Sequence, residues 1–454
     1  MNRLAIFAVA GASLPGLFVS NVVCAQTTAL PQVTVTGTRE KSLLNETPAA
    51  VGAISGDTVR QDRPNHPAQI MSQIPGVAVA VTNGEGHTTA IRQPFTTGPV
   101  YLFLEDGVPI RATGFFNHNA LYEVNVAQAG GIEVVRGPAA VLYGGNAVGG
   151  VVNTLDNRIP RTLIDGLSGA AEVRLGGPSN DRSGAVVLDG GSGRPNAGWG
   201  WHADLSERDA GNQRAPRFSS PTDDGSESRT TVRNSATHNH SAALGGSVFF
   251  QGGYAGVSVD DFRTTYGTTV EDAAKIKMKR QRVATAGEWN SDDGPVRRLS
   301  WQLSRNKYEH SEIEDGQVGT TFKSTGTDGR FELTHAPVGG LHGVVGVQFE
   351  SLDFSALGEE AFVPSTNTRN TGLFVLEQYR VGDLQLSAGA RHEQVRVHSD
   401  GDTDTSDGRF GAPSQRRFGP TSLAFSAVYP LGGGWSTSAN LNRTQRAPAY
   451  YELF

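Results

Sequence analysis

Alternation of apolar and polar residues is the dominant pattern of this chain from about Ser168 onward. Apolar residues recur at every second position in segments such as 171–175, 254–259 and 384–388. This period of two predicts half-buried β-strands, because successive side chains of a strand point to opposite faces of the sheet. Residues 160–454 are therefore expected to form one large sheet of many strands.

Polar stretches separate the predicted strands, and three of them are long. They cover residues 208–235, 355–371 and 400–417. Short turns alternating with long loops are typical of outer-membrane barrels, whose spans never give one long apolar run. The pattern favours a mainly β fold, a transmembrane antiparallel β-barrel. A soluble β-sandwich or propeller is the alternative, although no repeat of blade length stands out.

Residues 46–158 show a different pattern of hydrophobic and polar residues, which predicts a compact α/β domain. A short helix interrupted by prolines is expected at 58–71, and a turn leading into a strand at 74–79. Further strands are expected at residues 100–104, 132–136 and 149–155.

Residues 1–25 are interpreted as a secretory signal peptide. An apolar stretch at 4–23 follows an arginine, and small residues lead to cleavage after Ala25. A membrane-spanning helix is one alternative, but the apolar run is short and broken. A lipid anchor on Cys24 is another, although the bulky Val23 precedes it.

Composition narrows the function classes. The 454 residues include 57 glycines, only 37% are hydrophobic, and the net charge is −6. A negative charge gives no support to a nucleic-acid partner, which would require a basic patch. The 11 histidines are scattered without metal-ligand spacing. We find no nucleophile–base set, so no enzyme activity and no cofactor are expected.

The polar segment 26–45 holds a short run of alternating Val and Thr. The run, called the box segment below, consists of Gln32, Val33, Thr34, Val35, Thr36, Gly37 and Thr38. An exposed strand of this kind is suited to pairing with the sheet edge of another protein. A linker that happens to be β-branched is the alternative.

A glycine-rich motif at 135–153 resembles the plug-domain signature of TonB-dependent outer-membrane receptors. The signature positions are Glu133, just before the motif, and Arg136, Gly137, Pro138, Tyr143, Gly144, Gly149, Gly150 and Asn153 within it. Glycines permit tight turns and close backbone approach, which a small domain inside a barrel requires. Arg136 and Glu133 are expected to pair with charges that line the lumen. A phosphate-binding loop is disfavoured, because no Lys-Ser/Thr follows.

The resemblance covers nearly the whole chain after the leader. The box segment resembles the TonB box of the family, and some barrel segments resemble the branch that includes iron-chelate and zinc receptors. Family barrels have about 22 strands. Residues 443–454 resemble a family segment that normally lies well before the C-terminal end of the barrel sequence. We therefore expect the chain to be C-terminally truncated.

The resemblance implies active uptake of a metal chelate across the outer membrane, most simply an iron–siderophore complex. A receptor for zinc, another metal or cobalamin is an alternative, and a truncated, non-transporting remnant is a third. The implied partners are the TonB energy-transducing protein, outer-membrane lipid and the chelate. The implied molecule is a monomer in the outer membrane of a Gram-negative bacterium, reached through export to the periplasm.

Two plug loops mix cations, aromatic rings and amides, and are candidate ligand contacts. The candidates are Arg92, Gln93, Phe95, Arg111, Phe115, Phe116, Asn117 and His118. Loop residues without any ligand role are the alternative. His87 and His118 are also considered for a bare metal, but a solvated or lumen hydrogen-bonding role is favoured. His238 and His240 share one face of a strand, and two ligands do not complete a site.

Overall fold

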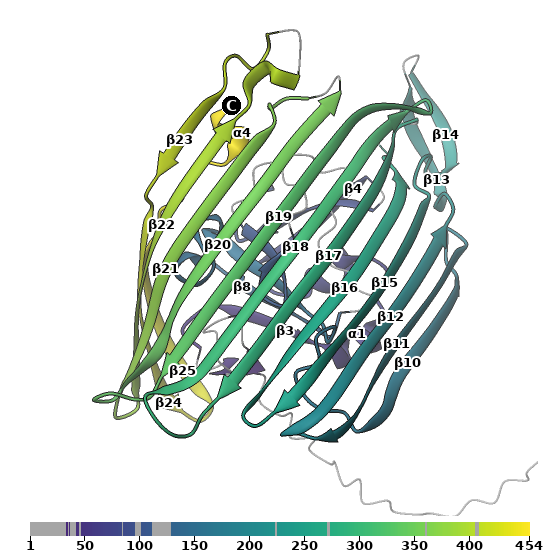
Figure 1. The fold of residues 1–454 in the computed structure, drawn as a ribbon. Helices are drawn as coiled ribbons and strands as arrows, with labels where there is room; N and C mark the ends of the chain where they lie inside the picture. Colours follow the sequence, from purple (N-terminus) through teal and green to yellow (C-terminus); the bar gives the residue numbers. More distant parts are fainter. Residues whose placement is uncertain are drawn as a thin grey trace, which may run out of the picture.

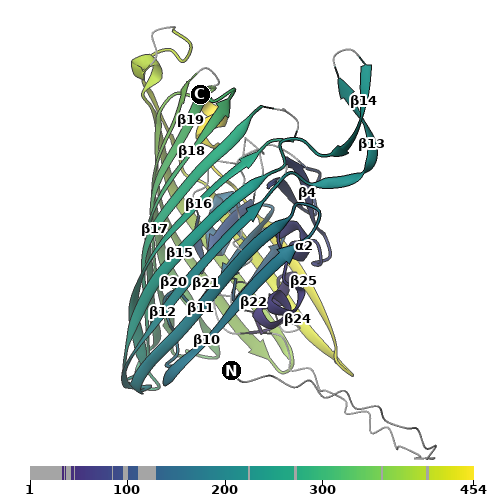
Figure 2. The same ribbon diagram turned by 90° about the vertical axis from the view of Figure 1, so that its right-hand side faces the viewer.

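The computed structural model describes most of the chain after the leader. The described residues are 33–34, 36, 42–44, 47–83, 85–95, 101–110, 129–222, 225–269, 273–358, 361–404 and 408–454. The predicted signal peptide lies outside them. A large curved sheet forms a wall, and a small α/β domain sits in its hollow (Figures 1 and 2). This arrangement confirms the predicted fold class.

The wall is a 14-stranded antiparallel sheet in which neighbours in sequence are mostly neighbours in space. β10 lies at one edge of the sheet and β25 at the other. Its strands are β10 Gly166–Gly176, β11 Asp181–Arg194, β12 Ala197–Ala210, β15 Thr237–Phe250, β16 Gly253–Gly267, β17 Lys275–Asn290, β18 Val296–Glu314, β19 Gln317–His335, β20 Leu341–Gly358, β21 Thr366–Val381, β22 Leu384–Ser399, β23 Ser414–Phe418, β24 Thr421–Gly432 and β25 Trp435–Arg443.

The two ends of the wall differ. Two-residue turns at 195–196, 251–252 and 382–383 lie at one end, and the longest connections, at 211–236, 268–274, 359–365 and 400–413, lie at the other (Figure 1). Exposed aromatic side chains mark the short-turn end. They are Trp199, Trp289, Tyr379, Tyr429 and Trp435. Outer-membrane barrels have short turns on the periplasmic side and aromatic girdles at the interfaces. The long-connection end is therefore the outer end.

The strands extend further than the polar pattern predicted. A hairpin of β13 (Arg214–Thr222) and β14 (Gly225–Thr231) occupies much of 208–235. β20 and β21 run into 355–371, and 400–417 contains the 3₁₀ helix η3 (Gly401–Asp404) and the start of β23. The prediction of loops across these stretches was wrong. Backbone pairing continues where both strand faces are polar, and hydrophobic periodicity carries no signal there.

The inner domain has a five-stranded sheet in the order β3-β8-β9-β6-β7. β6 and β9 are parallel, and the other pairs are antiparallel. Its elements are β1 Val33–Thr34, β2 Ser42–Leu43, β3 Val51–Ser55, α1 Gly56–Asp62, α2 Pro67–Met71, β4 Val77–Asn83, β5 Gly86–Ile91, β6 Tyr101–Glu105, β7 Val108–Pro109, β8 Gly131–Arg136, α3 Ala140–Tyr143, η2 Gly145–Ala147 and β9 Gly150–Leu155; the last helix of the chain is α4 Tyr450–Leu453.

The single helix predicted at 58–71 is two short helices. Arg63 adopts a left-handed conformation, with φ of 47°, and ends α1. His66 caps α2, because its side chain accepts a hydrogen bond from the backbone N–H of Ala68, and Pro67 opens the helix. No helix among the described residues is long and apolar enough to cross a membrane.

The hydrophobic core is shared between the inner domain and the wall. Ile70, Ile132 and Val152 are completely buried and belong to one cluster with Phe262 and Met278 of the wall strands. The glycines predicted to allow close approach do so. Gly144 has φ of 95°, and a Cβ on Gly145 would lie 2.8 Å from Cβ of Arg446.

Candidate functional site

The box segment is docked on the inner domain. β1 pairs with β2 in an antiparallel register, with Val33 opposite Leu43 and Thr34 opposite Ser42. Thr34 and Thr36 are almost completely buried. The remaining predicted box residues lie outside the described residues; they are Gln32, Val35, Gly37 and Thr38.

Glu133 of β8 anchors the box segment. Its Oε2 accepts hydrogen bonds from Oγ1 of Thr34 at 2.9 Å and from the backbone N–H of Thr36 at 2.7 Å. Hydrogen bonds to an ionised carboxylate are stronger than those between neutral groups. The expectation that Glu133 pairs with lumen charges therefore missed its contact with the box segment, 99 residues earlier in sequence.

Two more signature residues hold Thr36. Tyr143 donates its hydroxyl to the carbonyl of Thr36 at 3.0 Å, and Asn153 donates Nδ2–H to Oγ1 of Thr36 at 2.9 Å. Oδ1 of Asn153 accepts from the backbone N–H of Gly107 at 2.8 Å. Asn153 thus connects the box segment with the turn between β6 and β7.

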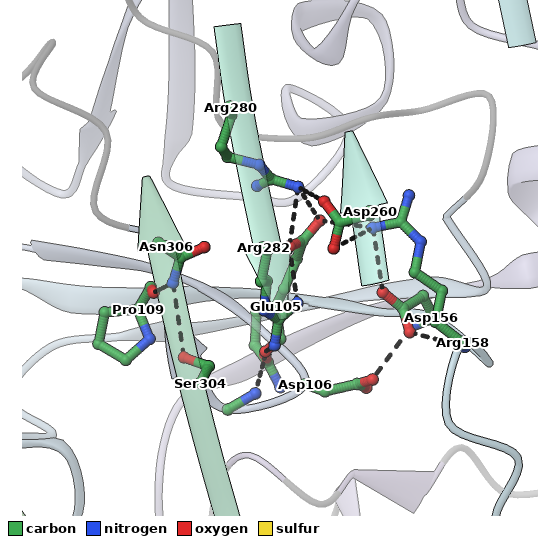
Figure 3. A network of polar contacts seen from close by, with 12 residues as sticks. Glu105, Asp106, Pro109, Asp156, Arg158, Asp260, Arg280, Arg282, Ser304 and Asn306 are labelled. Atoms are coloured by element: carbon green, nitrogen blue, oxygen red, sulfur yellow. Dashed lines mark hydrogen bonds and ion pairs between the residues drawn. The ribbon is translucent and has the colours of Figure 1, made fainter. Parts of the chain in front are cut away.

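That turn enters a buried ion network with the wall (Figure 3). Glu105 lies 3.1 Å from Arg280, 2.8 Å from Arg282 and 3.4 Å from Arg158, measured between side-chain nitrogen and oxygen atoms. Arg280 also reaches Asp260 of β16 at 2.9 Å. The network fastens the inner domain to β16 and β17.

The pKa values of the two carboxyl groups in the turn are shifted in opposite directions. Burial opposes ionisation of Glu105, but the three arginines outweigh it and hold its pKa well below the usual range. Burial and the neighbouring Asp156 raise the pKa of Asp106 to about 8, although Arg161 lies 3.1 Å from it. One carboxyl group is therefore a fixed charge, and its neighbour titrates near neutrality.

A second set of contacts holds the turn around α3. Glu393 of β22 accepts from the backbone N–H of Gly145 at 2.9 Å, and Arg330 of β19 donates to the carbonyl of Leu142. The guanidinium of Arg330 also lies over the ring of Tyr143, 5.5 Å from its centroid. The signature turn that holds the box segment is thus itself fixed to the wall.

The remaining residues of the plug-domain signature mainly determine and support the backbone conformation. Gly137 and Gly150 have φ of 120° and 153°, and the N–H of Gly137 donates to the carbonyl of Gly149 at 3.1 Å. Pro138 follows Gly137 in the same turn. Within the described part of the chain, Arg136 makes none of the expected contacts with lumen charges. It donates to the backbone carbonyls of Ala50, Val51 and Pro75.

The predicted ligand residues are only partly described. Arg92 follows β5 with φ of 53° and donates to the carbonyl of Arg136, and Phe95 is half exposed. Nε2 of Gln93 is buried without a hydrogen-bond partner among the described residues. The other loop lies outside the described residues; its candidates are Arg111, Phe115, Phe116, Asn117 and His118.

Of the two histidines considered for a bare metal, the structure describes His87, and His118 lies outside the described residues. His87 is buried, with its ring 4.8 Å from that of His66, and both rings contact the carbonyl of Glu85. Burial lowers the pKa of His66 to about 3. His238 and His240 lie on the outer face of β15. No group of three or more potential metal ligands occurs among the described residues.

Two cavities lie where the inner domain meets the wall. One, of about 480 Å³, is lined by His66, Glu85, Asp181 and Arg208 among others and lies toward the outer end. The pKa of Glu85 is raised by burial despite its ion pair with Arg208. A smaller cavity of about 130 Å³ is lined by residues that include Tyr101, Asn146, Glu350, Asn370, Arg446 and Tyr450.

Sequence reasoning missed the wall residues of the ion network. Asp260, Arg280 and Arg282 occupy alternate positions on β16 and β17 that face inward and are buried. A charged residue at every second position, with the lipid-facing face apolar, is the signal that could have identified them.

Comparisons with known proteins agree along most of the chain. The family model of the TonB-dependent receptor plug domain matches residues 44–151, and that of the TonB dependent receptor-like β-barrel matches 171–454. The vitamin B12 transporter BtuB of Photobacterium profundum is 23% identical over 440 residues, covering 96% of this chain and 65% of that relative.

Solved structures show the same fold. The copper transporter OprC superposes with a TM-score of 0.71 at 15% identity, covering 89% of this chain and 64% of OprC. The unliganded ferric citrate transporter FecA gives 0.67 at 16% identity, covering 90% and 65%. The chain spans just under two thirds of the length of these relatives. With a plug inside a β-wall and a barrel model that matches more than half of its residues, the chain belongs to the family of TonB-dependent receptors.

Proposed function

We propose that this chain takes part in TonB-driven uptake of a metal chelate across the outer membrane. The observation that carries the proposal is the buried docking of Thr34 and Thr36 on Glu133, Tyr143 and Asn153. A segment held by specific side chains, rather than by a continuous sheet, is suited to release. Release would free a strand of alternating Val and Thr for pairing with a partner.

The contacts also suggest how solute binding and box release are connected. Asn153 forms hydrogen bonds with both Thr36 and Gly107. Glu105, two residues before Gly107, forms ion pairs with Arg280 and Arg282 of the wall. A solute that shifts the plug relative to β17 would strain the Gly107–Asn153 contact. The side-chain amide of Asn153 would then no longer be oriented to donate its hydrogen bond to Thr36.

Two solute classes have support. An iron chelate agrees with the fold shared with FecA, a ferric citrate transporter. Cobalamin, a cobalt chelate, is favoured by the extended similarity to a vitamin B12 transporter. We place the ligand at the outer end, where the cavities lie between plug and wall. In this proposal the protein performs no covalent chemistry, works as a monomer and loses residues 1–25 on export.

The proposal is tested by uptake in cells that lack their own receptors for the labelled solutes. Cells expressing the protein are given a radiolabelled ferric siderophore or labelled cobalamin, with and without TonB. We expect TonB-dependent uptake of one solute, abolished by Val33→Pro, which removes a backbone N–H from the box strand. Val33→Ile keeps that N–H and is the matched control. Uptake that is unaffected by Val33→Pro would contradict the proposal.

A further inference from the structure

Two cavities lie at different heights against the same pair of wall strands, β21 and β22. The outer cavity, of about 130 Å³, is lined by residues that include Asn370 of β21 and Glu393 of β22. The inner cavity, of about 80 Å³, is lined by residues that include Leu376 of β21 and Ser387 of β22. The two-residue turn 382–383 joins these strands at the short-turn end, so the inner cavity lies nearer that end than the outer cavity does.

The turn around α3 fills the space between the two cavities. This α3 turn comprises residues 139–147, of which Leu142 lines the inner cavity and Asn146 lines the outer one. Between those heights, Cγ1 of Val141 lies 2.9 Å from the position that a Cβ on Gly389 of β22 would occupy. A residue without a side chain lets the α3 turn pack this closely against the wall. The α3 turn therefore separates the outer cavity from the inner one.

The α3 turn is also bonded to the box segment. Tyr143 donates its hydroxyl to the carbonyl of Thr36 at 3.0 Å, and Thr36 itself lines the inner cavity. Removal of the box segment takes this acceptor away from Tyr143 and withdraws Thr36 from the lining of the inner cavity. The same event therefore loosens the α3 turn and opens the inner cavity.

The wall beside the inner cavity is uncharged. β24 contains no charged residue, and the only one in β25 is its last residue, Arg443. Ser426 and Asn440 face each other across these two strands and line the inner cavity. On β17, by contrast, Arg282 holds the plug through a buried ion pair with Glu105. Breaking a buried ion pair is the costlier step, so the plug separates more readily from β24 than from β17.

The α3 turn is tethered to the wall by hydrogen bonds and not through charges of its own. None of residues 139–147 is charged. The backbone N–H of Gly145 donates to Glu393 at 2.9 Å, and Arg330 donates to the carbonyl of Leu142. Hydrogen bonds of this kind can be exchanged for hydrogen bonds with water or with a solute. The α3 turn can therefore leave the wall without carrying a buried charge with it.

Arg391 of β22 lies beside the α3 turn and has unused hydrogen-bond donors. Its Nη2 donates to Glu393 at 3.1 Å, and a Cβ on Gly144 of the α3 turn would lie 3.3 Å from the same nitrogen. Nε and Nη1 of Arg391 are buried and have no hydrogen-bond partner among the described residues. Unpaired buried donors are uncommon and require an explanation. The acceptor oxygens of an anionic chelate would pair with them once the α3 turn has moved.

We propose that the α3 turn is the stopper of a solute passage that runs along β21, β22 and β24 from the outer cavity to the inner one. The inference rests on the proposed uptake function and adds a route to it. Withdrawal of the box segment loosens the α3 turn, and the two cavities join. Arg391 then contacts the anionic groups of the passing chelate. The ion network at β16 and β17 stays closed throughout.

The first test measures how fast a thiol reagent reaches each side of the plug. The full chain is expressed in cells with or without TonB, and the cells are supplied with a ferric siderophore and cobalamin. Ser426→Cys places a thiol at the inner cavity, and Ser258→Cys is the matched control at a buried position of β16. The native Cys24 lies in the predicted signal peptide. We expect TonB to raise the rate of maleimide labelling at position 426 by about tenfold or more and to leave the rate at position 258 unchanged.

The second test closes the passage with a disulfide between the α3 turn and β22. The bond geometry of a disulfide places Cβ of one cysteine about 3 Å from Sγ of the other. The 2.9 Å between Cγ1 of Val141 and a Cβ on Gly389 is close to this distance. In the double variant Val141→Cys, Gly389→Cys, the oxidised protein should stop uptake of the solute that the wild type takes up. Reduction of the same protein is the control and should restore uptake.

The outcomes distinguish the route from the uptake itself. Uptake that continues while the disulfide is formed, or labelling that rises at position 258 and not at position 426, would overturn the stopper and leave the uptake function standing. Absence of uptake by the wild type, with no TonB-dependent labelling at either position, would contradict both. The labelling test needs single serine-to-cysteine changes only, so it decides the inference whatever the folding of the double variant.

Discussion

At the scale of single residues, the plug uses similar carboxyl groups in three different ways. Glu105 is an ion held by three arginines. Glu133 is a hydrogen-bond acceptor for a segment distant in sequence. Burial and the neighbouring Asp156 raise the pKa of Asp106 to about 8, so this carboxyl group is protonated below that pH. The surroundings decide each role, because burial penalises the charge and only nearby donors or cations offset that penalty.

The raised pKa of Asp106 predicts a pH-dependent stability. The folded state binds the proton more tightly than the unfolded state, so stability from this group is lost as pH rises from about 4 to about 8. Asp106→Asn should remove that contribution and reduce the fall in the thermal unfolding midpoint between about pH 6 and about pH 8.5. Calorimetry of the purified chain and the variant measures the difference. An equal fall in both proteins would refute the assignment.

At the scale of elements, sequence periodicity identifies strands but not their contacts. The alternation at 254–259 and 384–388 correctly places β16 and β22. The docking of Thr34 on Glu133 spans 99 residues, and no period or propensity encodes it. Sequence reasoning did not single out Glu105, because its arginine partners lie 175 and 177 residues later on β17. Contacts between residues so distant in sequence can be identified only once the three-dimensional fold is known.

Asn153 is the residue that connects two elements of the plug, and its replacement should loosen the box segment. Asn153→Ala removes the donor to Thr36 and the acceptor for Gly107, both buried, at a cost of about 1–3 kcal/mol. Hydrogen exchange at Thr36 should accelerate by about tenfold to a hundredfold. Tyr143→Phe, which removes only the hydroxyl bond to Thr36, should have a smaller effect. Unchanged exchange in Asn153→Ala would exclude the connection.

At the scale of the whole molecule, the plug is fixed to the wall on two sides. Glu105 reaches β17 through Arg280 and Arg282, and the α3 turn reaches β22 through Glu393. The wall itself ends at β10 and β25 within the described residues. The contacts at β17 and β22 therefore hold the plug in the hollow of the wall.

The ion network should decide whether the plug stays in the wall. Arg280→Ala with Arg282→Ala leaves Glu105 buried with Arg158 as its remaining arginine, and breaking a buried pair costs about 3–5 kcal/mol. We expect faster hydrogen exchange throughout β6 and β9, with exchange in β19 to β21 unchanged. Adding Glu105→Gln removes the uncompensated charge and should restore part of the protection. If protection of β6 stays at the wild-type level in the double arginine variant, the ion network does not decide whether the plug stays in the wall.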